Sequence, residues 1–338
     1  MSSLSVEFEE ILSQLSLANL NKLEATLLAN AKNNLPYCDK KLDHLRALLP
    51  PQKQESAIII SAGPSIHRRK SIQCILDSSY EGCIIAVDAA YVACLRAGLI
   101  PDFVVSLDSH ATRMVRWFGD PNLAENTKND DYFKRQDLDV EFRKNAETKN
   151  QQNIELVNRY GHLTRGIVSS SIPSNVLDRL LQAKMDLFWW NPLVDDPYSE
   201  NSLTKRLFEI NQLSALNTGG NVGTSAWVFA TDVLTIPHIA MVGMDLGYYA
   251  DTPYTMTQTY PQIVQYNESP DQLDKYFVNY QFPLTQEKFY TDVTYYWYRR
   301  NFLELLQQSK SRTVNCTEGG ILFDDRLPCI FLKDFLNG

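Results

Sequence analysis

The chain has 338 residues, of which 44% are hydrophobic and 11% aromatic, and its formal net charge is −8 at pH 7. This length suits one large α/β domain with a small helical attachment. The negative charge argues against a protein that binds nucleic acid through a broad basic face, because such binding is mostly neutralisation of phosphates by Lys and Arg. A net charge of −8 is still compatible with a small pocket that binds one nucleotide.

The N-terminus and the cysteines indicate the compartment. The first residues, MSSLSVEFEEILSQL, carry acidic side chains where a secretion signal carries basic ones. No apolar run reaches the roughly 18 residues that a membrane span needs. The six cysteines show neither a CxxC pair nor a metal-ligand spacing. We therefore expect a cytoplasmic protein without a membrane span.

The first 52 residues are predicted to form a helical segment, followed by a domain over residues 53–338. Residues 4–33 carry apolar side chains at helical spacing, and a second helix around Lys40–Leu49 ends before Pro50 and Pro51. We predict that the apolar face packs on the chain's own core. Use of this face in a homo-oligomer or with a partner protein is the alternative.

From Ser56 onward, short β-branched runs alternate with helical stretches, which predicts an α/β, Rossmann-like, mostly parallel sheet with helices on both faces. The predicted strands are Ala57–Ala62, Cys83–Val87, Phe103–Leu107, Gly166–Ser169, Asp186–Trp190, His238–Val242 and Thr313–Asn315. The predicted helices are Ser65–Leu76, Ala89–Ala97, Pro173–Ala183, Ser202–Gln212, Val222–Val233 and Glu287–Gln308.

A polar insertion interrupts this alternation at about residues 120–162, which are rich in Asn, Lys, Asp, Glu and Gln. It is interpreted as a solvated helical insertion or lid beside a binding crevice. A surface excursion without a role is an equal alternative, because composition alone does not separate the two.

Most predicted strands end in a polar or small residue. In a parallel sheet these ends lie on one edge, where open α/β folds bind ligands. We therefore expect the following residues to share one crevice: Gly63, Asp88, Asp108, Ser169, Asn191, Asp245, Asn315 and Thr317.

The first motif is Gly63-Pro64-Ser65, directly after the first strand. A glycine permits a tight turn and lets a ligand approach the backbone, and Ser65 is expected to cap the following helix, whose N-terminus suits a phosphate. The motif predicts a nucleotide phosphate site, with a plain strand-to-helix turn as the alternative.

Two carboxylates, Asp88 and Asp108, end successive strands. They are suited to bind the ribose or base of a nucleotide, or to hold Mg²⁺. His110 follows closely, and an imidazole is able to act as a general base near neutral pH, so Asp108 and His110 are candidate catalytic residues.

The glycine-rich stretch Thr218-Gly219-Gly220-Asn221 precedes a helix and predicts a second anion site. It lacks the Lys of a Walker P-loop and does not match GxGxxG, which disfavours nucleoside triphosphatases and dehydrogenases of the usual kinds. On the last long helix, Tyr295, Tyr298 or a neighbouring Arg is a candidate to stabilise a leaving phosphate. Of these, Tyr298 is the predicted catalytic residue.

Taken in order, GPS, VDAA, GLIPDFVVSLDSH, NTGGNVGTSAWVFA, IAMVGMDLGY and NCTEGG resemble the MptE-like and motility-associated factor (Maf) family, from about Ser56 to the C-terminus. The order of the motifs is also similar to that of bacterial CMP-sialic acid sialyltransferases. The resemblance implies nucleotide contacts or site roles for Gly63, Pro64, Ser65, Asp88, Asp108, Gly219, Gly220 and Asp245.

The resemblance implies two activities. One is a glycosyltransferase that moves a nonulosonic sugar from a CMP-activated donor to a protein or glycan acceptor. The other is a 6-hydroxymethylpterin diphosphokinase that uses ATP and Mg²⁺, with Asp88 and Asp108 as metal ligands. Maf-like sequences often carry a His soon after the Asp-Leu-Gly-Tyr stretch that ends at Tyr248, and this chain does not. A nucleotide-binding protein without catalysis is therefore the third hypothesis.

Overall fold

The structure is a computed structural model that describes residues 24–126, 128, 140–257, 259–260, 263–264, 273–274 and 276–337, with the backbone alone over residues 140–147. Its centre is an eight-stranded parallel sheet in the order β11-β7-β1-β2-β3-β4-β5-β6. These strands are β1 (Ser56–Ile60), β2 (Cys83–Val87), β3 (Phe103–Ser106), β4 (Arg165–Ser169), β5 (Asp186–Leu193), β6 (Ala215–Asn217), β7 (His238–Val242) and β11 (Arg312–Asn315).

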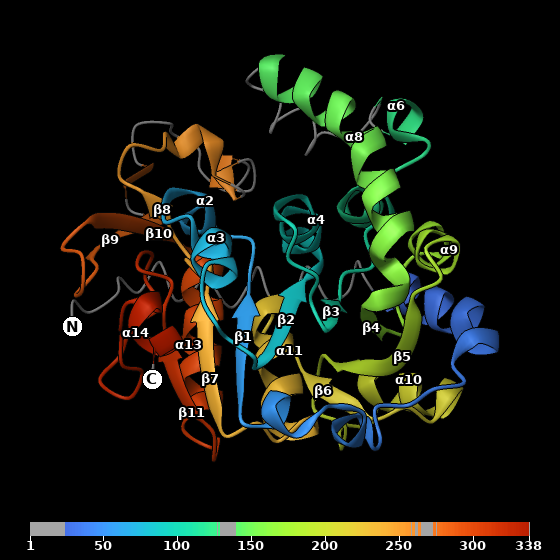
Figure 1. Cartoon of the computed structure of the whole chain (residues 1–338). Coiled ribbons are helices and arrows are strands. Elements are labelled where there is room, and N and C mark those ends of the chain that lie inside the picture. Colours follow the sequence, from blue (N-terminus) through green and yellow to red (C-terminus); the bar gives the residue numbers. More distant parts are fainter. Residues whose placement is uncertain are drawn as a thin grey trace.

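Helices cover the two faces of this sheet, as the alternating pattern predicted (Figure 1). The α-helices are α2 (Ser65–Arg68), α3 (Ser71–Leu76), α4 (Asp88–Ala97), α5 (Ala111–Met114), α6 (Leu123–Asn126), α8 (Val140–Tyr160), α9 (Ser174–Gln182), α10 (Leu203–Asn211), α11 (Val222–Val228), α13 (Val293–Leu306) and α14 (Leu332–Asn337). The 3₁₀ turns are η1 (Leu35–Tyr37), η2 (Leu45–Leu48), η3 (Pro51–Gln54), η4 (Val115–Phe118), η5 (Gly161–Leu163) and η7 (Tyr254–Met256), and η6 (Phe229–Val233) is a π-helix.

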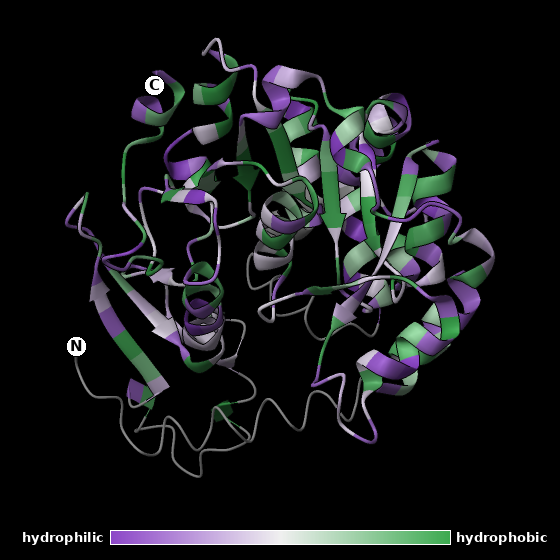
Figure 2. Ribbon diagram, turned by 90° about the horizontal axis from the view of Figure 1, so that it is seen from below, coloured by the Kyte–Doolittle hydropathy of each residue, from purple (hydrophilic) through white to green (hydrophobic). Residues whose placement is uncertain are grey.

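Alternate residues of the central strands enter two separate cores, one on each face of the sheet. Phe103 and Val105 of β3 belong to one buried cluster, and Val104 between them belongs to the other. Successive side chains of a strand point to opposite faces, so burial on both faces requires a continuous apolar run. In Figure 2 the central strands are accordingly green, while the surrounding helices are banded in purple and green.

The order of the strands fixes where a ligand site can form. From β1 the chain builds the sheet outward in one direction to β6, and β7 then returns to the other side of β1. The direction of winding therefore reverses between β1 and β7. In open α/β sheets such a switch point leaves a crevice at the carboxyl ends of the two strands.

Three sequence predictions about helices are wrong. In place of the helix predicted around Lys40–Leu49, the chain forms only the 3₁₀ turn η2 over Leu45–Leu48, and His44 directly before it has a left-handed backbone (φ 67°). The helix predicted over Ser65–Leu76 is broken at Lys70, which has a left-handed backbone (φ 54°) and separates α2 from α3. The helix predicted from Glu287 begins only at Val293, because Lys288–Asp292 form strand β10.

Strand β10 belongs to a second, antiparallel sheet that the sequence analysis did not predict. It pairs with β8 (Tyr248–Tyr249) and β9 (Phe277–Gln281). Its aromatic rings pack on one another and on the turn η7: the ring centroids of Tyr248 and Tyr290 are 5.3 Å apart, and those of Tyr254 in η7 and Phe277 are 4.1 Å apart. This sheet lies beyond the carboxyl edge of the main sheet, above β7 in Figure 1.

The insertion predicted at residues 120–162 contains α6 and the long helix α8. The latter part of α8 packs on the domain: Ile154 lies against Gly119, and Asn150 bonds to the backbone of Asp120. The earlier part extends past the carboxyl edge of the sheet and leans over the middle of the molecule, above α4 in Figure 1. Residues 127 and 129–139 lie outside the described residues, and a role as a lid stays a prediction.

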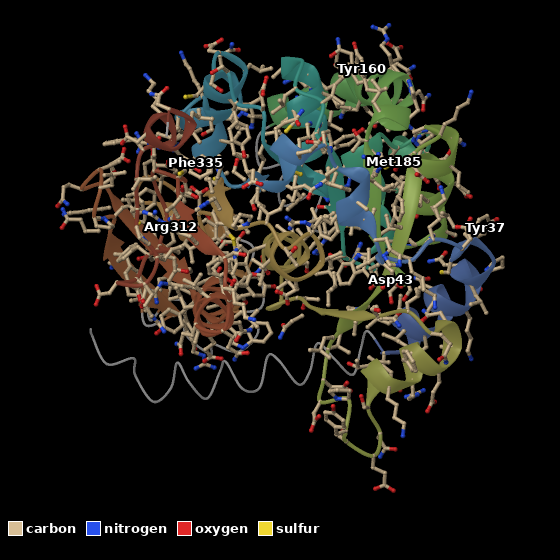
Figure 3. The ribbon with its side chains drawn as sticks, turned by 60° about the horizontal axis from the view of Figure 1, so that its bottom comes forward. Tyr37, Asp43, Tyr160, Met185, Arg312 and Phe335 are labelled. Carbon is tan, nitrogen blue, oxygen red and sulfur yellow. The ribbon has the colours of Figure 1, made fainter. Side chains whose placement is uncertain are left out.

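The described part of the N-terminal segment packs on the sheet domain, as predicted from its apolar face. Leu27 and Ala31 contact α10, and Leu45 and Leu49 join the main core. Figure 3 shows Tyr37 of this segment and Arg312 of β11 on opposite sides of the molecule. The apolar positions before residue 24 lie outside the described residues, and the domain boundary at residue 52 stays a prediction. No described helix combines the length and the apolarity needed to cross a membrane.

The side chain of Asn34 fastens the N-terminal segment to the end of β4. It is buried and donates to the carbonyls of Ser170 and Ile172, at 2.8 Å each. We expect Asn34→Ala to lower the free energy of unfolding by about 2 to 3 kcal/mol, because two buried carbonyls lose their partner. Asn33→Ala, one position earlier and exposed, is the matched control and should change it by less than about 0.5 kcal/mol. Chemical denaturation measures both, and equal effects would contradict the anchoring role.

Candidate functional site

The candidate site lies where the carboxyl ends of β1 and β7 meet. The amide of Ser61 donates to the carbonyl of Val242, and the amide of Gly63 donates to the carbonyl of Gly243, at 2.8 Å each. The two strands thus stay paired past their last regular residues. The loops that follow β1 and β7 therefore lie close together at the switch point.

Asp245 is the buried centre of this junction, with 2% of its surface exposed. The Ser65 hydroxyl donates to its Oδ2 at 2.6 Å, and the Ser65 amide donates to its Oδ1 at 3.2 Å. Burial raises the pKa of Asp245 to about 6, and the two bonds from Ser65 oppose that rise. Ser65 therefore fixes a carboxylate and does not cap α2 with its side chain, which corrects the capping role expected from the sequence.

Gly63 is required by this packing. A Cβ atom at this position would lie 2.0 Å from Oδ2 of Asp245 and 2.5 Å from the carbonyl oxygen of Gly243. The glycine is thus explained by the approach of the β7 loop. Pro64 follows it, exposed, at the start of α2.

Asp88 and Asp108 lie close enough to influence each other. Asp88 is 3% exposed and accepts a hydrogen bond from the amide of Ala89 at 2.7 Å. Burial raises its pKa to about 7; the Ala89 amide opposes the rise and the charge of Asp108 adds to it. At neutral pH, Asp88 is therefore poised between its acid and its carboxylate.

Asp108 and His110 lie on the exposed side of the same edge. Asp108 accepts a hydrogen bond from the amide of His110 at 3.0 Å, and Nδ1 of His110 lies 3.3 Å from the hydroxyl of Thr112. Both side chains are exposed, so the pair is accessible to a substrate.

The glycine-rich turn after β6 is closed by its own hydrogen bonds. The amide of Gly219 donates to Asn217 Oδ1 at 3.0 Å, that of Gly220 to Thr218 Oγ1 at 3.1 Å, and that of Asn221 to the Thr218 carbonyl at 2.9 Å. Positive φ angles of 51° and 90° at the two glycines allow this turn. An anion bound here would compete with these internal bonds.

Asn221 caps helix α11. Its Oδ1 accepts from the amide of Thr224 at 2.9 Å, and its Nδ2 donates to the hydroxyl of that residue at 3.0 Å. The hydroxyl of Ser225 donates to the carbonyl of Asn221 at 3.1 Å. Thr224 and Ser225 are buried and serve the turn itself.

Tyr298 of α13 joins this turn to the carboxylates. A Cβ atom on Gly220 would lie 2.7 Å from its ring, and the neighbouring Asn301 donates to the carbonyl of Gly219 at 3.2 Å. Burial raises the pKa of Tyr298 to about 12, and the charges of Asp292 and then Asp108 add to the rise. Its phenol therefore keeps its proton at neutral pH, within electrostatic range of Asp108.

Other polar residues near the edge are structural. Arg299 donates to the carbonyls of Ile321 and Phe323, at 2.8 and 2.6 Å, so its guanidinium is committed to the C-terminal loop. Thr317 accepts from the amide of Met244 at 3.2 Å, and Asn315 accepts from the amide of Thr317 at 2.9 Å. Arg299 thus has a packing role, and the use of an Arg of this helix on a phosphate stays a prediction.

Asp292 is a buried acid close to Tyr298 that the sequence does not predict as part of this edge. It is 1% exposed, caps α13 through the amide of Tyr295 at 2.9 Å, and accepts from Tyr248 at 3.0 Å and Thr259 at 2.6 Å. Burial raises its pKa. An Asp directly before a helix is a signal for a cap, but the helix had been predicted to start at Glu287.

The structure thus brings the predicted residues to one edge, and their roles in binding and catalysis stay predictions. Within the described ranges, no three His, Cys, Asp or Glu side chains gather closely enough to hold a metal ion. Asp88 and Asp108 alone would provide at most two carboxylates, with substrate phosphates and water completing the shell of Mg²⁺.

Comparisons with known proteins agree with this fold. Residues 26–126 match the family model described as 6-hydroxymethylpterin diphosphokinase MptE-like. The solved structure of a Maf glycosyltransferase from Magnetospirillum magneticum AMB-1 superposes with a TM-score of 0.54 at 15% sequence identity, over 89% of this chain and 37% of that protein. The chain therefore spans well under half of that protein's length. No curated protein matches. The predicted likeness to MptE-like and Maf proteins is confirmed, and the likeness to sialyltransferases stays a prediction.

The buried acids make the stability of the chain depend on pH. The folded-state pKa of Asp88 is about 7, above its ordinary value of 3.8, so the folded state holds a proton that the unfolded state releases. The free energy of unfolding should therefore fall as the pH rises from about 4 to about 7. Asp88→Asn should make this dependence shallower, and Asp43→Asn, at an exposed position, should not. Urea denaturation from pH 5 to 8 checks this; identical slopes in the two variants would contradict the burial argument.

Gly63→Ala should disrupt the junction of β1 and β7. The added methyl collides with the carboxylate of Asp245 and with the Gly243 backbone, so one of the two loops must move. We expect a loss of about 1 to 3 kcal/mol in the free energy of unfolding, the usual cost of overpacking. Pro64→Ala, next along the chain and exposed, is the control. Thermal denaturation compares them, and a Gly63→Ala variant as stable as the wild type would argue against this close approach.

Proposed function

We propose that this chain, which resembles MptE-like and Maf proteins, is a glycosyltransferase that uses a nucleotide-activated sugar, with a CMP-nonulosonate as donor. The observation that carries the proposal is Tyr298: its ring packs on Gly220, and its phenol lies within electrostatic range of Asp108. A protonated donor and an exposed carboxylate thereby face the same edge. The phenol of Tyr298 is suited to donate a hydrogen bond to a departing phosphate, and the carboxylate of Asp108 is suited to accept the proton of an acceptor hydroxyl.

The donor nucleotide would lie at the switch point between β1 and β7. Asp88, with its pKa near neutrality, is suited both to donate and to accept hydrogen bonds with ribose or base groups. Gly63 and Pro64 border the crevice, and the Ser65–Asp245 pair fixes the loop that carries them. These contacts are predictions that rest on the position of the residues.

The transfer step needs one base and one stabilised leaving group. The acceptor hydroxyl would give its proton to Asp108 or His110 as its oxygen forms a bond to the anomeric carbon. The bond from that carbon to the phosphate oxygen breaks, and its electron pair leaves with CMP. Tyr298 keeps its proton at neutral pH and would donate a hydrogen bond to the departing phosphate. The acceptor would be a protein or glycan hydroxyl.

The second candidate is a diphosphokinase. The family match over residues 26–126 favours it, since that stretch contains Asp88 and Asp108. Mg²⁺, held by these two carboxylates and the phosphates of ATP, would supply neutralisation of charge during transfer. A partly protonated Asp88 suits this role less well, because a metal ligand must be ionised. A nucleotide-binding protein without turnover is the third candidate.

A thermal-shift panel separates the glycosyltransferase from the kinase, and release of CMP from a CMP-nonulosonate then separates the glycosyltransferase from a protein that binds without turnover. The ligands are CMP, CDP, AMP, ATP and GTP, each with and without Mg²⁺. Glycosyl transfer predicts stabilisation by CMP that does not depend on the metal, because the protein alone binds the nucleotide. ATP binding that requires Mg²⁺ would favour the kinase, and no shift with any nucleotide would remove all three candidates.

Tyr298→Phe tests the catalytic assignment. The variant keeps the ring against Gly220 and loses only the hydroxyl, so CMP affinity should stay within a factor of about 3 while release of CMP from a CMP-nonulosonate falls about 100-fold, the usual cost of one transition-state donor. Tyr198→Phe is the matched control, since Tyr198 is 95% exposed. Unchanged turnover in Tyr298→Phe would remove Tyr298 from the mechanism.

A further inference from the structure

A groove lies between α2–α3 and α4, apart from the crevice of the proposed function. Its volume is about 310 Å³. Its lining residues are Ile66, His67, Lys70, Ile72, Gln73, Ala93, Arg96 and Ala97. Three of them carry basic side chains, and none is acidic.

The three basic side chains of the groove, His67, Lys70 and Arg96, have no counter-charge of their own. Over the ranges that the structure describes, none of them takes part in an ion pair or a side-chain hydrogen bond. The residues between them behave differently: Arg68 pairs with Asp251 at 3.2 Å, and Arg69 pairs with Glu287. Within residues 67–70, the two basic side chains without an ion pair, His67 and Lys70, are therefore the two that line the groove.

The backbone at Lys70 is held in a costly conformation. Its φ of 54° and ψ of 38° are left-handed, a conformation that is unfavourable for a residue with a side chain. The break between α2 and α3 occurs at this residue and places it at the groove. Strain of this kind persists where the surrounding structure enforces it, and it is concentrated at functional positions.

The wall of the groove is apolar. Ile66 and Ile72 are 4% and 7% exposed, and Ala93 is half-buried beside them. The Arg96 side chain is exposed at the rim of the groove, and its partial burial there lowers the pKa of the guanidinium. A ligand that brings negative charge would supply what the protein does not.

We propose that this groove is a second ligand site, which takes a small phosphate monoester with an apolar group. Arg96 offers a planar fork that fits phosphate oxygens in pairs, and Lys70 offers a point charge. His67 lies beside them, and the apolar group packs on Ile66 and Ile72. A volume of about 310 Å³ is at the small end of ligand sites.

The groove and the crevice use different residues of the same short helix. Ser65 turns to Asp245 in the crevice, whereas His67 lines the groove. The second site therefore does not depend on the proposed function, and each can be tested without the other.

Isothermal titration with phenyl phosphate tests the site, with phenol as the neutral control. Wild-type protein should bind phenyl phosphate and not phenol, and Lys70→Gln and Arg96→Gln should each weaken binding at least tenfold. Lys184→Gln is the matched control, because Lys184 is exposed and has the same φ of 54° outside the groove. CMP binding in the crevice should be equal in all variants that fold, which separates this test from that of the proposed function.

Methyl signals locate the bound probe. In protein with labelled alanine and isoleucine methyl groups, phenyl phosphate should shift the signals of Ala97 and Ile72 in the groove. Three results would overturn the proposal: no binding to the wild type, equal binding to Lys70→Gln and Lys184→Gln, or shifts confined to residues of the crevice.

Discussion

The close approach of the loops after β1 and β7 is the constraint on which the candidate site depends. No Cβ atom fits at Gly63 against Asp245, and a Cβ atom on Gly320 would lie 2.1 Å from the Asp245 carbonyl oxygen. The same carbonyl accepts from the amide of Ile321 at 2.8 Å. Asp245 is thereby held by two segments that are far from it in the chain, residues 63–65 and 320–321, and these contacts determine the shape of the crevice.

Several buried carboxylates lie near this edge, and each accepts hydrogen bonds from neighbouring donor groups. Asp245 has Ser65, Asp88 has the amide of Ala89, and Asp292 has Tyr248, Thr259 and the amide of Tyr295. A buried carboxylate without such partners would be costly. Their raised pKa values show that the donors offset burial only in part. Groups of this kind suit acid–base chemistry near neutral pH and are often found at functional sites.

The parallel sheet and its edge could be predicted from the sequence because they rest on local patterns. Buried runs such as Ile58–Ile60 indicate strands covered on both faces, and parallel strands place their carboxyl ends together. The three-residue strand β6 was missed because so short a run gives no periodic signal. The sequence predicts a helix over Lys288–Asp292, because aromatic and polar side chains there continue without a break into α13.

Contacts between residues far apart in the chain could not be predicted from the sequence. Ser65 resembles a helix cap, and only the structure shows that its partner is Asp245, 180 positions away. Lys70 resembles an interior helical residue, yet packing forces it into a left-handed turn. Tyr298 and Gly220 are also far apart in the sequence, so their contact could not be predicted from it: it depends on how α13 packs against the sheet. Local propensity is overridden at the positions where distant segments meet.

A crystal structure of the chain with CMP would test the central claim most directly. We expect the nucleotide at the switch point between β1 and β7, with its phosphate beside Gly63 and the Ser65–Asp245 hydrogen bond intact. A nucleotide bound elsewhere on the sheet, or at the switch point only after that bond has broken, would contradict it.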